Sequence, residues 1–362
     1  MRLLPLLSLV VLSCTSGGLG PSPPRRNHDE TTPPTPETGP PVDTEETEDT
    51  EETEDTEETE ETEDTEETEE TEVYDTGPFP ELDCEARIAE PFEVRVLDDA
   101  KAYHGISFDD DGNLIGWDGS RSLMKSPYDG AAVLFVPGMT WVEQIDRLPD
   151  GDFAVAEPGA ARLARVTPTG ATSTIATGVG SLYGVTVGPD GNVYIANGDV
   201  YRVWVDTGVV ELLVDLRRIV TAHTLDFNLD STKMYIGTIG GGFYAVDLDD
   251  DLNPLGEEVE VATFGGWHDG TAVDECGDIW VADYSTSSLY RVDGETYEVT
   301  MVHRASPTSE YGHGIMWGTG IGGWRLDALY QPLPYNRNKV KEVIIDARSG
   351  DHLRTWRGKP VP

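Results

Sequence analysis

A repeat of about 40 residues constrains the fold of this chain more than any other feature. In each copy, one polar or aromatic residue precedes a short apolar run, and a turn begins six residues after it. We call these residues the anchors: His104, Glu143, Tyr183, His223, Asp269 and His313. Successive anchors are 39, 40, 40, 46 and 44 residues apart, which is the spacing typical of β-propeller blades.

The third copy, residues 182–213, shows what one repeat contains. Its runs GVTV, NVYIA, VYRVWV and VVELL are rich in Val, Ile and Tyr, and turn formers separate them. Four such strands make one antiparallel sheet, which is too small to be stable alone and must pack against its copies. The six anchors therefore predict an all-β, six-bladed β-propeller with four-stranded antiparallel blades over residues 81–362.

Residues 1–14 have the pattern of a signal peptide, because an Arg precedes an apolar run too short for a permanent membrane span. The run ends in VLSC, which resembles a bacterial lipobox, and this resemblance implies lipidation of Cys14. An ordinary secretory signal is the alternative. Thr15 after the cysteine implies, by the same resemblance, an exported outer-membrane lipoprotein facing the periplasm or the cell surface.

Residues 15–80 are rich in Pro and then in Thr-Glu-Glu and Thr-Glu-Asp triplets. Between Asp29 and Glu72 there are 23 acidic residues, out of 68 in the whole chain. This segment has no apolar face to bury and its charges repel, so we expect a disordered linker. Its role is either a spacer or a merely solubilising tail. The remaining chain shows no basic stripe, so nucleic acid is not an expected partner.

The ends of the globular region are expected to meet. Phe92–Leu97 reads as a strand, and propellers close their ring by letting one terminus complete the blade of the other. We therefore expect it in the sixth blade, beside Lys339–Asp346 and His352–Trp356. Cys84 and Cys276 are both expected at the base of the ring, where an exported protein can oxidise them to a disulfide. Two unrelated thiols are the alternative.

Inner strands of a propeller all start at one end of the channel, so the anchors are expected to surround its mouth. Their imidazoles and carboxylates suit zinc or another transition metal better than calcium, which prefers carboxylates alone. The candidate metal ligands are His104, His223, Asp269 and His313. The candidate acid/base groups are Asp269, Glu143 and Tyr183. The alternative is that these residues are ordinary polar lining of a water-filled channel. His268, His303 and His352 lie outside the register.

Two segments resemble the senescence-marker-protein/gluconolactonase (regucalcin-like) group and the related NHL-repeat propellers. They read TLDFNLDSTKMYIGTIGGGFYAVDLDDDLNP and DGTAVDECGDIWVADYSTSSLYRVD. In lactonases of that group, a Glu, an Asn and an Asp hold a divalent cation at the channel mouth, and the Asp is also the proposed base. Asp269 matches this Asp, whereas His104 replaces the Glu and His223 replaces the Asn. Lyases of the NHL group hold zinc with three histidines, so the resemblance implies a zinc-type site.

Two functions are consistent with these features. One is a metal-dependent enzyme, either a lactonase-like hydrolase or a lyase, whose small substrate enters the channel mouth. The other is a non-enzymatic propeller, displayed on a stalk, that binds a ligand or another surface protein. In both cases the lipid anchor is the only expected membrane contact, and we expect a monomer.

Overall fold

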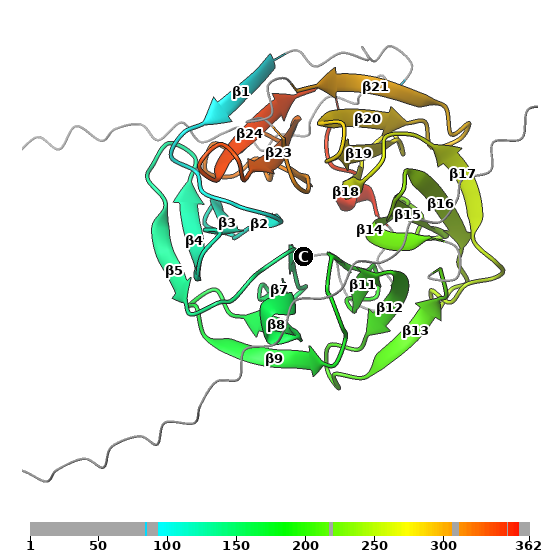
Figure 1. Cartoon of the computed structure of the whole chain (residues 1–362), viewed down its shortest axis with the longest axis horizontal. Helices are drawn as coiled ribbons and strands as arrows, with labels where there is room; N and C mark the ends of the chain where they lie inside the picture. The colour runs from blue at the N-terminus through cyan, green and yellow to red at the C-terminus, as the bar shows by residue number, and fades with distance from the viewer. Residues whose placement is uncertain (1–83, 85–92, 217–219, 306–310, 346, 355–362) are drawn as a thin grey trace, which may run out of the picture. The chain divides into compact units, whose positions relative to one another are not determined.

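The computed structural model describes Cys84 and residues 93–216, 220–305, 311–345 and 347–354. Within them, 24 strands form six separate four-stranded sheets arranged around a central channel (Figure 1). Neighbouring strands in each sheet pair antiparallel, as in the third blade. The all-β, six-bladed propeller predicted from the repeats is confirmed.

Two compact units divide the chain, residues 1–69 and 70–362, and every described residue belongs to the second. The signal peptide, the lipidation of Cys14 and the acidic linker are predictions that lie outside the described residues. The helical segments that are described are short 3-10 turns, Pro158–Ala160 and Asp351–Leu353. Neither of these described turns is long and apolar enough to cross a membrane.

Five blades each contain four strands that follow one another in the sequence, with the first strand innermost (Figure 1). The first two blades are β2 (Ile106–Phe108), β3 (Asn113–Trp117), β4 (Ser122–Pro127), β5 (Val133–Pro137), and β6 (Ile145–Arg147), β7 (Phe153–Glu157), β8 (Arg162–Val166), β9 (Thr172–Thr177). The next three are β10 (Gly184–Val187), β11 (Val193–Asn197), β12 (Asp199–Val203), β13 (Val210–Val214); β14 (Thr221–Phe227), β15 (Lys233–Ile239), β16 (Gly242–Asp247), β17 (Val259–Thr263); and β18 (His268–Val273), β19 (Ile279–Asp283), β20 (Ser288–Val292), β21 (Val299–Arg304).

The sixth blade joins the two ends of the propeller. From the channel outward its strands are β22 (Met316–Trp317), β23 (Ala328–Leu333), β24 (Lys339–Ile344) and β1 (Glu93–Leu97). The first strand of the chain thus completes the last blade, as predicted, and it pairs antiparallel with β24.

The prediction of a strand over His352–Trp356 is wrong for the part of this range that the structure describes, because Asp351–Leu353 forms a 3-10 turn. The N–H of Leu353 bonds to the Gly350 carbonyl at 2.9 Å, so local bonds replace a sheet ladder. Arg354, the next residue, turns inward and pairs with Asp226 at 2.7 Å. This buried ion pair draws the segment under the channel instead of along a blade.

The turns at the base of the blades depend on Asp side chains. In the first blade, Asp109 accepts the backbone N–H groups of Asp111 and Asn113 at 3.1 and 2.7 Å. Gly112 in this turn has a φ of 75°, a conformation that glycine adopts without strain. This hydrogen bonding is ordinary hairpin chemistry, and it fixes where each inner strand ends.

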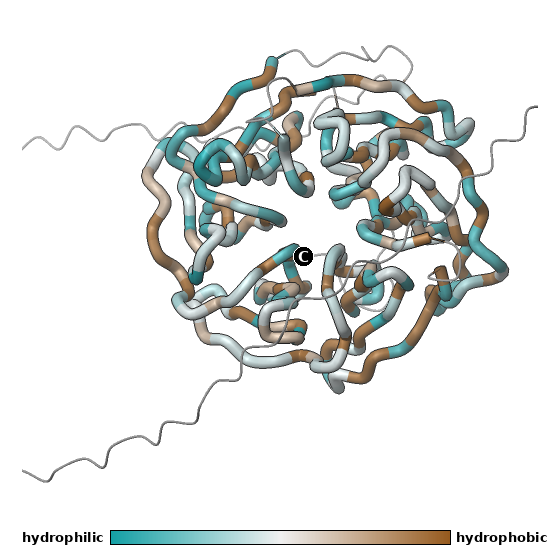
Figure 2. Tube along the Cα trace, viewed as in Figure 1, coloured by the Kyte–Doolittle hydropathy of each residue, from teal (hydrophilic) through white to brown (hydrophobic). Residues whose placement is uncertain are grey.

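Hydrophobic residues recur along the strands of the blades (Figure 2). Their buried side chains form clusters between neighbouring blades. At the closure, the fully buried Trp324 of the sixth blade lies 5.1 Å from the Phe108 ring in the first blade. Its indole N–H also donates to the Gly112 carbonyl at 2.8 Å. Burial of such large side chains contributes about 2 kcal/mol each, so this packing stabilises the closed ring.

Cys84 and Cys276 form the predicted disulfide, with their Cα atoms 5.8 Å apart. Cys276 lies in the turn between β18 and β19, at the base of the fifth blade. The bridge joins residues separated by 192 positions, and so it links Cys84, which precedes β1, to a different blade.

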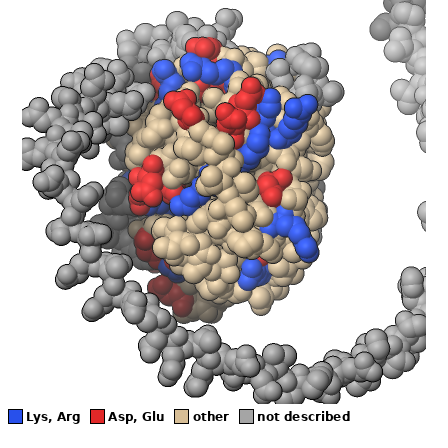
Figure 3. Space-filling model, turned by 90° about the vertical axis from the view of Figure 1, so that its left-hand side faces the viewer, with Lys and Arg blue, Asp and Glu red and all other residues tan. Residues whose placement is uncertain are grey.

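On the face drawn in Figure 3, Lys and Arg side chains are interspersed with Asp and Glu.

Candidate functional site

The anchors meet at one end of the channel because every innermost strand begins there. His104, Glu143, Tyr183 and His313 lie one to three residues before their strands, and His223 and Asp269 lie within β14 and β18. Hydrogen bonds and ring contacts link the side chains in the order Glu143, His104, His313, Asp269, His223 and Tyr183. The structure thus brings all six predicted residues together, whereas their chemical roles stay predictions.

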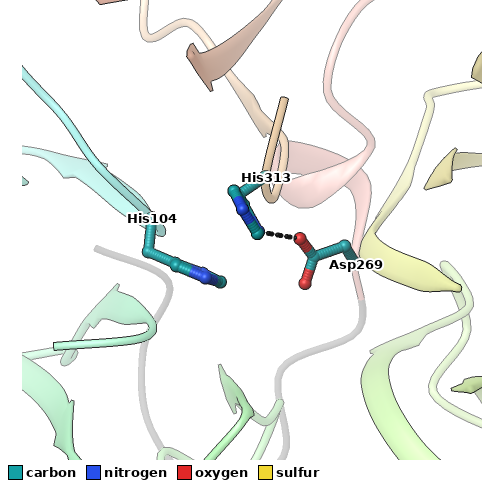
Figure 4. Close-up of side chains that lie close together, drawn as sticks. All are labelled: His104, Asp269 and His313. Atoms are coloured by element: carbon teal, nitrogen blue, oxygen red, sulfur yellow. Dashed lines mark hydrogen bonds and ion pairs between the residues drawn. The ribbon is translucent and has the colours of Figure 1, made fainter. Parts of the chain in front are cut away.

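His104, Asp269 and His313 form the centre of this cluster (Figure 4). Each offers one ligand atom, and the three atoms lie within 4.8 Å of one another. His313 is hydrogen-bonded through Nδ1 to Oδ2 of Asp269. The rings of His104 and His313 approach to 3.8 Å between centroids. Two imidazoles and one carboxylate from the first, fifth and sixth blades therefore share one small volume.

Glu143 orients His104 from the neighbouring blade. Its Oε2 lies 2.9 Å from Nδ1 of His104, and the Glu143 residue is only 4% exposed. Burial lowers the pKa of His104, but the hydrogen bond and charge of Glu143, helped by the Asp269 charge, raise it overall. With Nδ1 engaged by a carboxylate, Nε2 of His104 is the nitrogen left for other chemistry.

Both ring nitrogens of His223 have partners. Nδ1 lies 3.0 Å from the His268 carbonyl oxygen and 3.3 Å from Oδ1 of Asp269. Nε2 accepts the indole N–H of Trp267 at 3.2 Å. Burial lowers the pKa of His223 by more than the Asp269 charge raises it. His223 is thus a neutral imidazole that donates from Nδ1, and it holds the Asp269 carboxylate in place.

Asp269 is the point at which the hydrogen bonds of the cluster converge. Burial alone would raise its pKa, but the imidazoles of His313, His223 and His104 lower the pKa to about 2. The carboxylate is therefore ionised at any physiological pH. An ionised, buried carboxylate beside imidazoles has the charge and position of a metal ligand or of a proton acceptor.

Aromatic residues that the sequence pattern did not indicate surround the cluster. Tyr284 stacks on the His313 ring at 4.5 Å, and its hydroxyl lies 2.6 Å from that of Tyr335. Tyr284 directly follows β19, and Tyr335 follows β23 by two residues. The second strand of each blade runs back toward the mouth of the channel, so the residues just after that strand also line the mouth. That rule was the signal available in the sequence.

A cavity of about 20 Å³ lies within the mouth, lined by His104, Tyr183, His223 and Asp269 among others. This volume has room for one water molecule or one ion. Tyr183 stacks on the His223 ring at 4.9 Å and forms one wall of the cavity. The polar side chains therefore enclose space for a single small group, which is a suitable geometry for a divalent cation.

Comparison with known proteins yields a family match that includes Tyr183, His223 and Asp269 of this site but not His104, Glu143 or His313. Residues 177–309 match the family model described as the SMP-30/Gluconolactonase/LRE-like region. No curated protein matches the sequence.

Solved structures of three other proteins share the fold. A gluconolactonase from Xanthomonas campestris is 15% identical, with a TM-score of 0.59 over 73% of this chain and 96% of that one. The calcium-binding protein regucalcin from Agrobacterium tumefaciens is 17% identical, with a TM-score of 0.58 over 72% and 96%. Virginiamycin B lyase from Staphylococcus aureus, crystallised with quinupristin, is 15% identical, with a TM-score of 0.50 over 70% and 99%. The chain is therefore a six-bladed β-propeller, and its residues 177–309 match the model of the SMP-30/Gluconolactonase/LRE-like region.

Proposed function

We propose that this chain is a divalent-metal-dependent enzyme, a lactonase-like hydrolase or a lyase, that acts on a small molecule at the channel mouth. The observation that carries the proposal is the cluster of His104, Asp269 and His313, whose ligand atoms lie within 4.8 Å of one another. The cavity of about 20 Å³ beside them supports it. The likeness in fold to a gluconolactonase and to a lyase supports these two reaction types as candidates.

The side chains of the cluster fit a transition metal better than calcium. Two imidazole nitrogens and one carboxylate oxygen are the donors that zinc and similar metals prefer, whereas calcium prefers oxygen ligands alone. Three protein ligands leave one position open, as in catalytic zinc sites. Glu143 lies 2.9 Å from Nδ1 of His104. Metal-binding histidines usually have such a carboxylate on the ring nitrogen that does not bind the metal.

Each residue of the cluster has a distinct role in this proposal. A cation bound by His104, Asp269 and His313 would supply Lewis acidity for polarising a substrate oxygen. Asp269 is also the candidate base, since its carboxylate stays ionised. Glu143 and His223 are positioning residues, because Glu143 contacts His104 and His223 contacts Asp269.

Aromatic side chains around the mouth are proposed to hold the substrate. Tyr183 and Tyr284 stack on His223 and His313, so their rings flank the cluster on two sides. The paired hydroxyls of Tyr284 and Tyr335 offer hydrogen bonds to substrate oxygens at the rim. Tyr183 stays the candidate acid/base group nearest to the cavity.

Elemental analysis of purified residues 81–362 tests the proposal. After reconstitution with zinc we expect about one metal ion per chain, lost in His104→Ala, Asp269→Asn and His313→Ala. His303→Ala is the matched control, because His303 lies on the outermost strand β21 and should leave the metal content unchanged. If the wild type retains no metal after reconstitution with zinc and with calcium, the metalloenzyme proposal is wrong.

In that case, the non-enzymatic alternative would be favoured, in which the propeller is displayed on a stalk and captures a ligand or another surface protein. Its support is the acidic segment before the propeller, which is long enough to hold a binding domain away from a membrane.

We also propose that the protein is exported and anchored in the outer membrane through a lipid on Cys14. The disulfide between Cys84 and Cys276 supports export, because such bonds persist in oxidising compartments. Mass spectrometry of the mature N-terminus tests this proposal directly. A Cys14→Ser variant should appear in the soluble envelope fraction. Recovery of the wild type without lipid would contradict the anchor.

A further inference from the structure

The end of the channel opposite the mouth contains a chamber of about 600 Å³. Its walls are the final residues of the inner strands, and the segment 348–354 contributes part of its lining. Gln144, Val185, Thr186 and Thr271 line both this chamber and the mouth cavity, and so they separate the two spaces. The chamber has the size of a small-molecule site, for which about 300–1,000 Å³ is typical.

Two acidic side chains occupy equivalent places in this chamber. Asp146 in β6 and Asp226 in β14 each lie three residues after an anchor. Oδ2 of Asp146 accepts the N–H of Val187 at 2.6 Å, and Oδ2 of Asp226 accepts the N–H of Val273 at 3.0 Å. Each carboxylate thus reaches the inner strand of the next blade and is held at the same depth in the channel.

The two carboxylates differ in their charge partners. Oδ1 of Asp226 accepts a hydrogen bond from the buried guanidinium of Arg354 at 2.7 Å. Among the described residues, no side-chain nitrogen of Lys or Arg lies within ion-pair distance of Asp146. Burial, with the charges of Asp351 and Asp226, raises the pKa of Asp146 to about 7 despite its two backbone hydrogen bonds. Asp146 is therefore a fixed carboxylate with no ion pair of its own: the charge of Arg354 reaches it, but that guanidinium is hydrogen-bonded to Asp226.

The other cations that line the chamber are already paired. Arg147 bonds to Asp110, and Arg348 forms a bidentate pair with Glu275 at 2.6 and 2.7 Å. Their charges are thus compensated by their own partners, and they leave the Asp146 carboxylate as the group able to bind a ligand cation.

Unpartnered donors in the same chamber point to a ligand independently. The Arg354 side chain is only 4% exposed, and its Nε–H has no hydrogen-bond partner among the described residues. The Thr271 hydroxyl is likewise buried and without a described partner. A buried donor left unpaired costs about 1–3 kcal/mol. A bound molecule with an oxygen acceptor would remove that cost.

Apolar side chains form part of the remaining wall, together with polar ones such as Ser107 and Thr319. Phe108, Val187, Ile315 and Trp317 line the chamber between its polar groups. The indole N–H of Trp317 is already used, since it donates to the Val273 carbonyl at 3.1 Å. The Trp317 ring therefore offers hydrophobic contact. Pockets with mostly apolar walls and a few placed polar groups are typical of small-molecule sites.

We propose that this chamber is a second binding site, which takes a small amphipathic amine: its ammonium group binds Asp146, its oxygen accepts from Arg354 or Thr271, and its apolar body packs against Phe108 and Trp317. The site is distinct from the proposed metal centre and does not depend on it. Binding requires no covalent step.

Calorimetric titration of residues 81–362 with phenylalaninol tests the proposal, because this probe carries an ammonium, a hydroxyl and an aromatic ring. The matched probe is 3-phenylpropan-1-ol, which lacks only the amine. We expect phenylalaninol to bind about tenfold tighter or more, since a hydrogen-bonded charge is worth about 1.5–3 kcal/mol. Asp146→Asn should abolish this preference. Asp150→Asn, the same substitution at an exposed position outside the chamber, should retain it.

A second variant keeps the test decisive if Asp146→Asn does not fold. Thr319 lines the chamber and is half-buried, so Thr319→Lys adds a cation without disturbing the core. It should weaken the binding of phenylalaninol, whereas Thr319→Gln should not. Equal affinity for the two probes, tighter binding of 3-phenylpropionate, or no binding of either amine or alcohol to the wild type would overturn the proposal.

Discussion

Trp267 donates its indole N–H to Nε2 of His223 at 3.2 Å, and so it joins the fifth blade to the fourth at the channel mouth. This contact occupies the nitrogen that His223 would need to bind a metal while its Nδ1 faces the His268 carbonyl. His223 was predicted from sequence as a ligand, and its geometry makes it a positioning residue of Asp269 in our proposal.

The two roles give different outcomes for His223→Ala. If His223 only positions Asp269, we expect zinc affinity to fall about 10- to 100-fold, as when other residues that hydrogen-bond to metal ligands are replaced. One zinc should still be bound at saturation. His104→Ala, which removes a proposed ligand, should instead lower the stoichiometry itself. Competition with a chromophoric chelator measures both quantities. Loss of stoichiometric zinc in His223→Ala would restore the ligand role and contradict our assignment.

Glu143→Gln is expected to lower the pKa of His104. Burial opposes protonation of this imidazole, and the hydrogen bond and charge of Glu143 outweigh it. The amide keeps a hydrogen-bond acceptor but removes the charge, so the pKa of His104 should fall. NMR titration of the metal-free protein measures it, and Tyr183→Phe is the control. An unchanged His104 titration would show that the 2.9 Å contact between the two side chains is not formed in solution.

The repeat register accounts for how much of the site the sequence could predict. An anchor marks the start of each inner strand, and these starts all lie at the mouth, so His104, Asp269 and His313 were found without any structure. Tyr284 and Tyr335 were missed because they follow second strands, whose distance from the anchor differs between blades. They lie 15 and 22 residues after their anchors, Asp269 and His313.

The base of the channel was beyond sequence reasoning for a different reason. Its chamber depends on Arg354, whose segment was predicted as a strand and instead forms the turn Asp351–Leu353. The pairing of Arg354 with Asp226, 128 residues away, and the hydrogen bonds of Arg348 with Glu275 hold this segment under the channel. Contacts of that range leave no periodic pattern. The disulfide was predictable because both cysteines could be placed at the base from the direction of neighbouring strands.

Cys276→Ser should lower the free energy of unfolding by about 2–5 kcal/mol, the usual cost of losing a native disulfide. The bond joins residues 192 positions apart and ties the segment before β1 to the fifth blade. Urea denaturation of residues 81–362 measures this change, and wild type treated with reductant should match the variant. Equal stability of oxidised wild type and variant would mean that the closing segment is held by the pairing of β1 with β24 alone.

Asp146→Asn should change the pH dependence of stability in a defined direction. The pKa of Asp146 is raised from 3.8 to about 7 in the folded protein, by burial and by the charges of Asp351 and Asp226. A raised carboxyl pKa gives a stabilising contribution that is complete below the unfolded pKa and is lost as the pH rises through the folded pKa.

The free energy of unfolding of the wild type should therefore fall by on the order of 2 kcal/mol between pH 5 and pH 8 because of Asp146 alone. The Asn variant has no charge to bury and should lack this loss, so its stability relative to wild type should improve as the pH rises. Urea denaturation at the two pH values measures the difference, with Asp150→Asn as the exposed control. If the difference in free energy of unfolding between wild type and Asp146→Asn is the same at both pH values, solvent that enters the chamber hydrates the carboxylate. In that case Asp146 would titrate near its ordinary pKa, and an ammonium ligand would gain less by pairing with it.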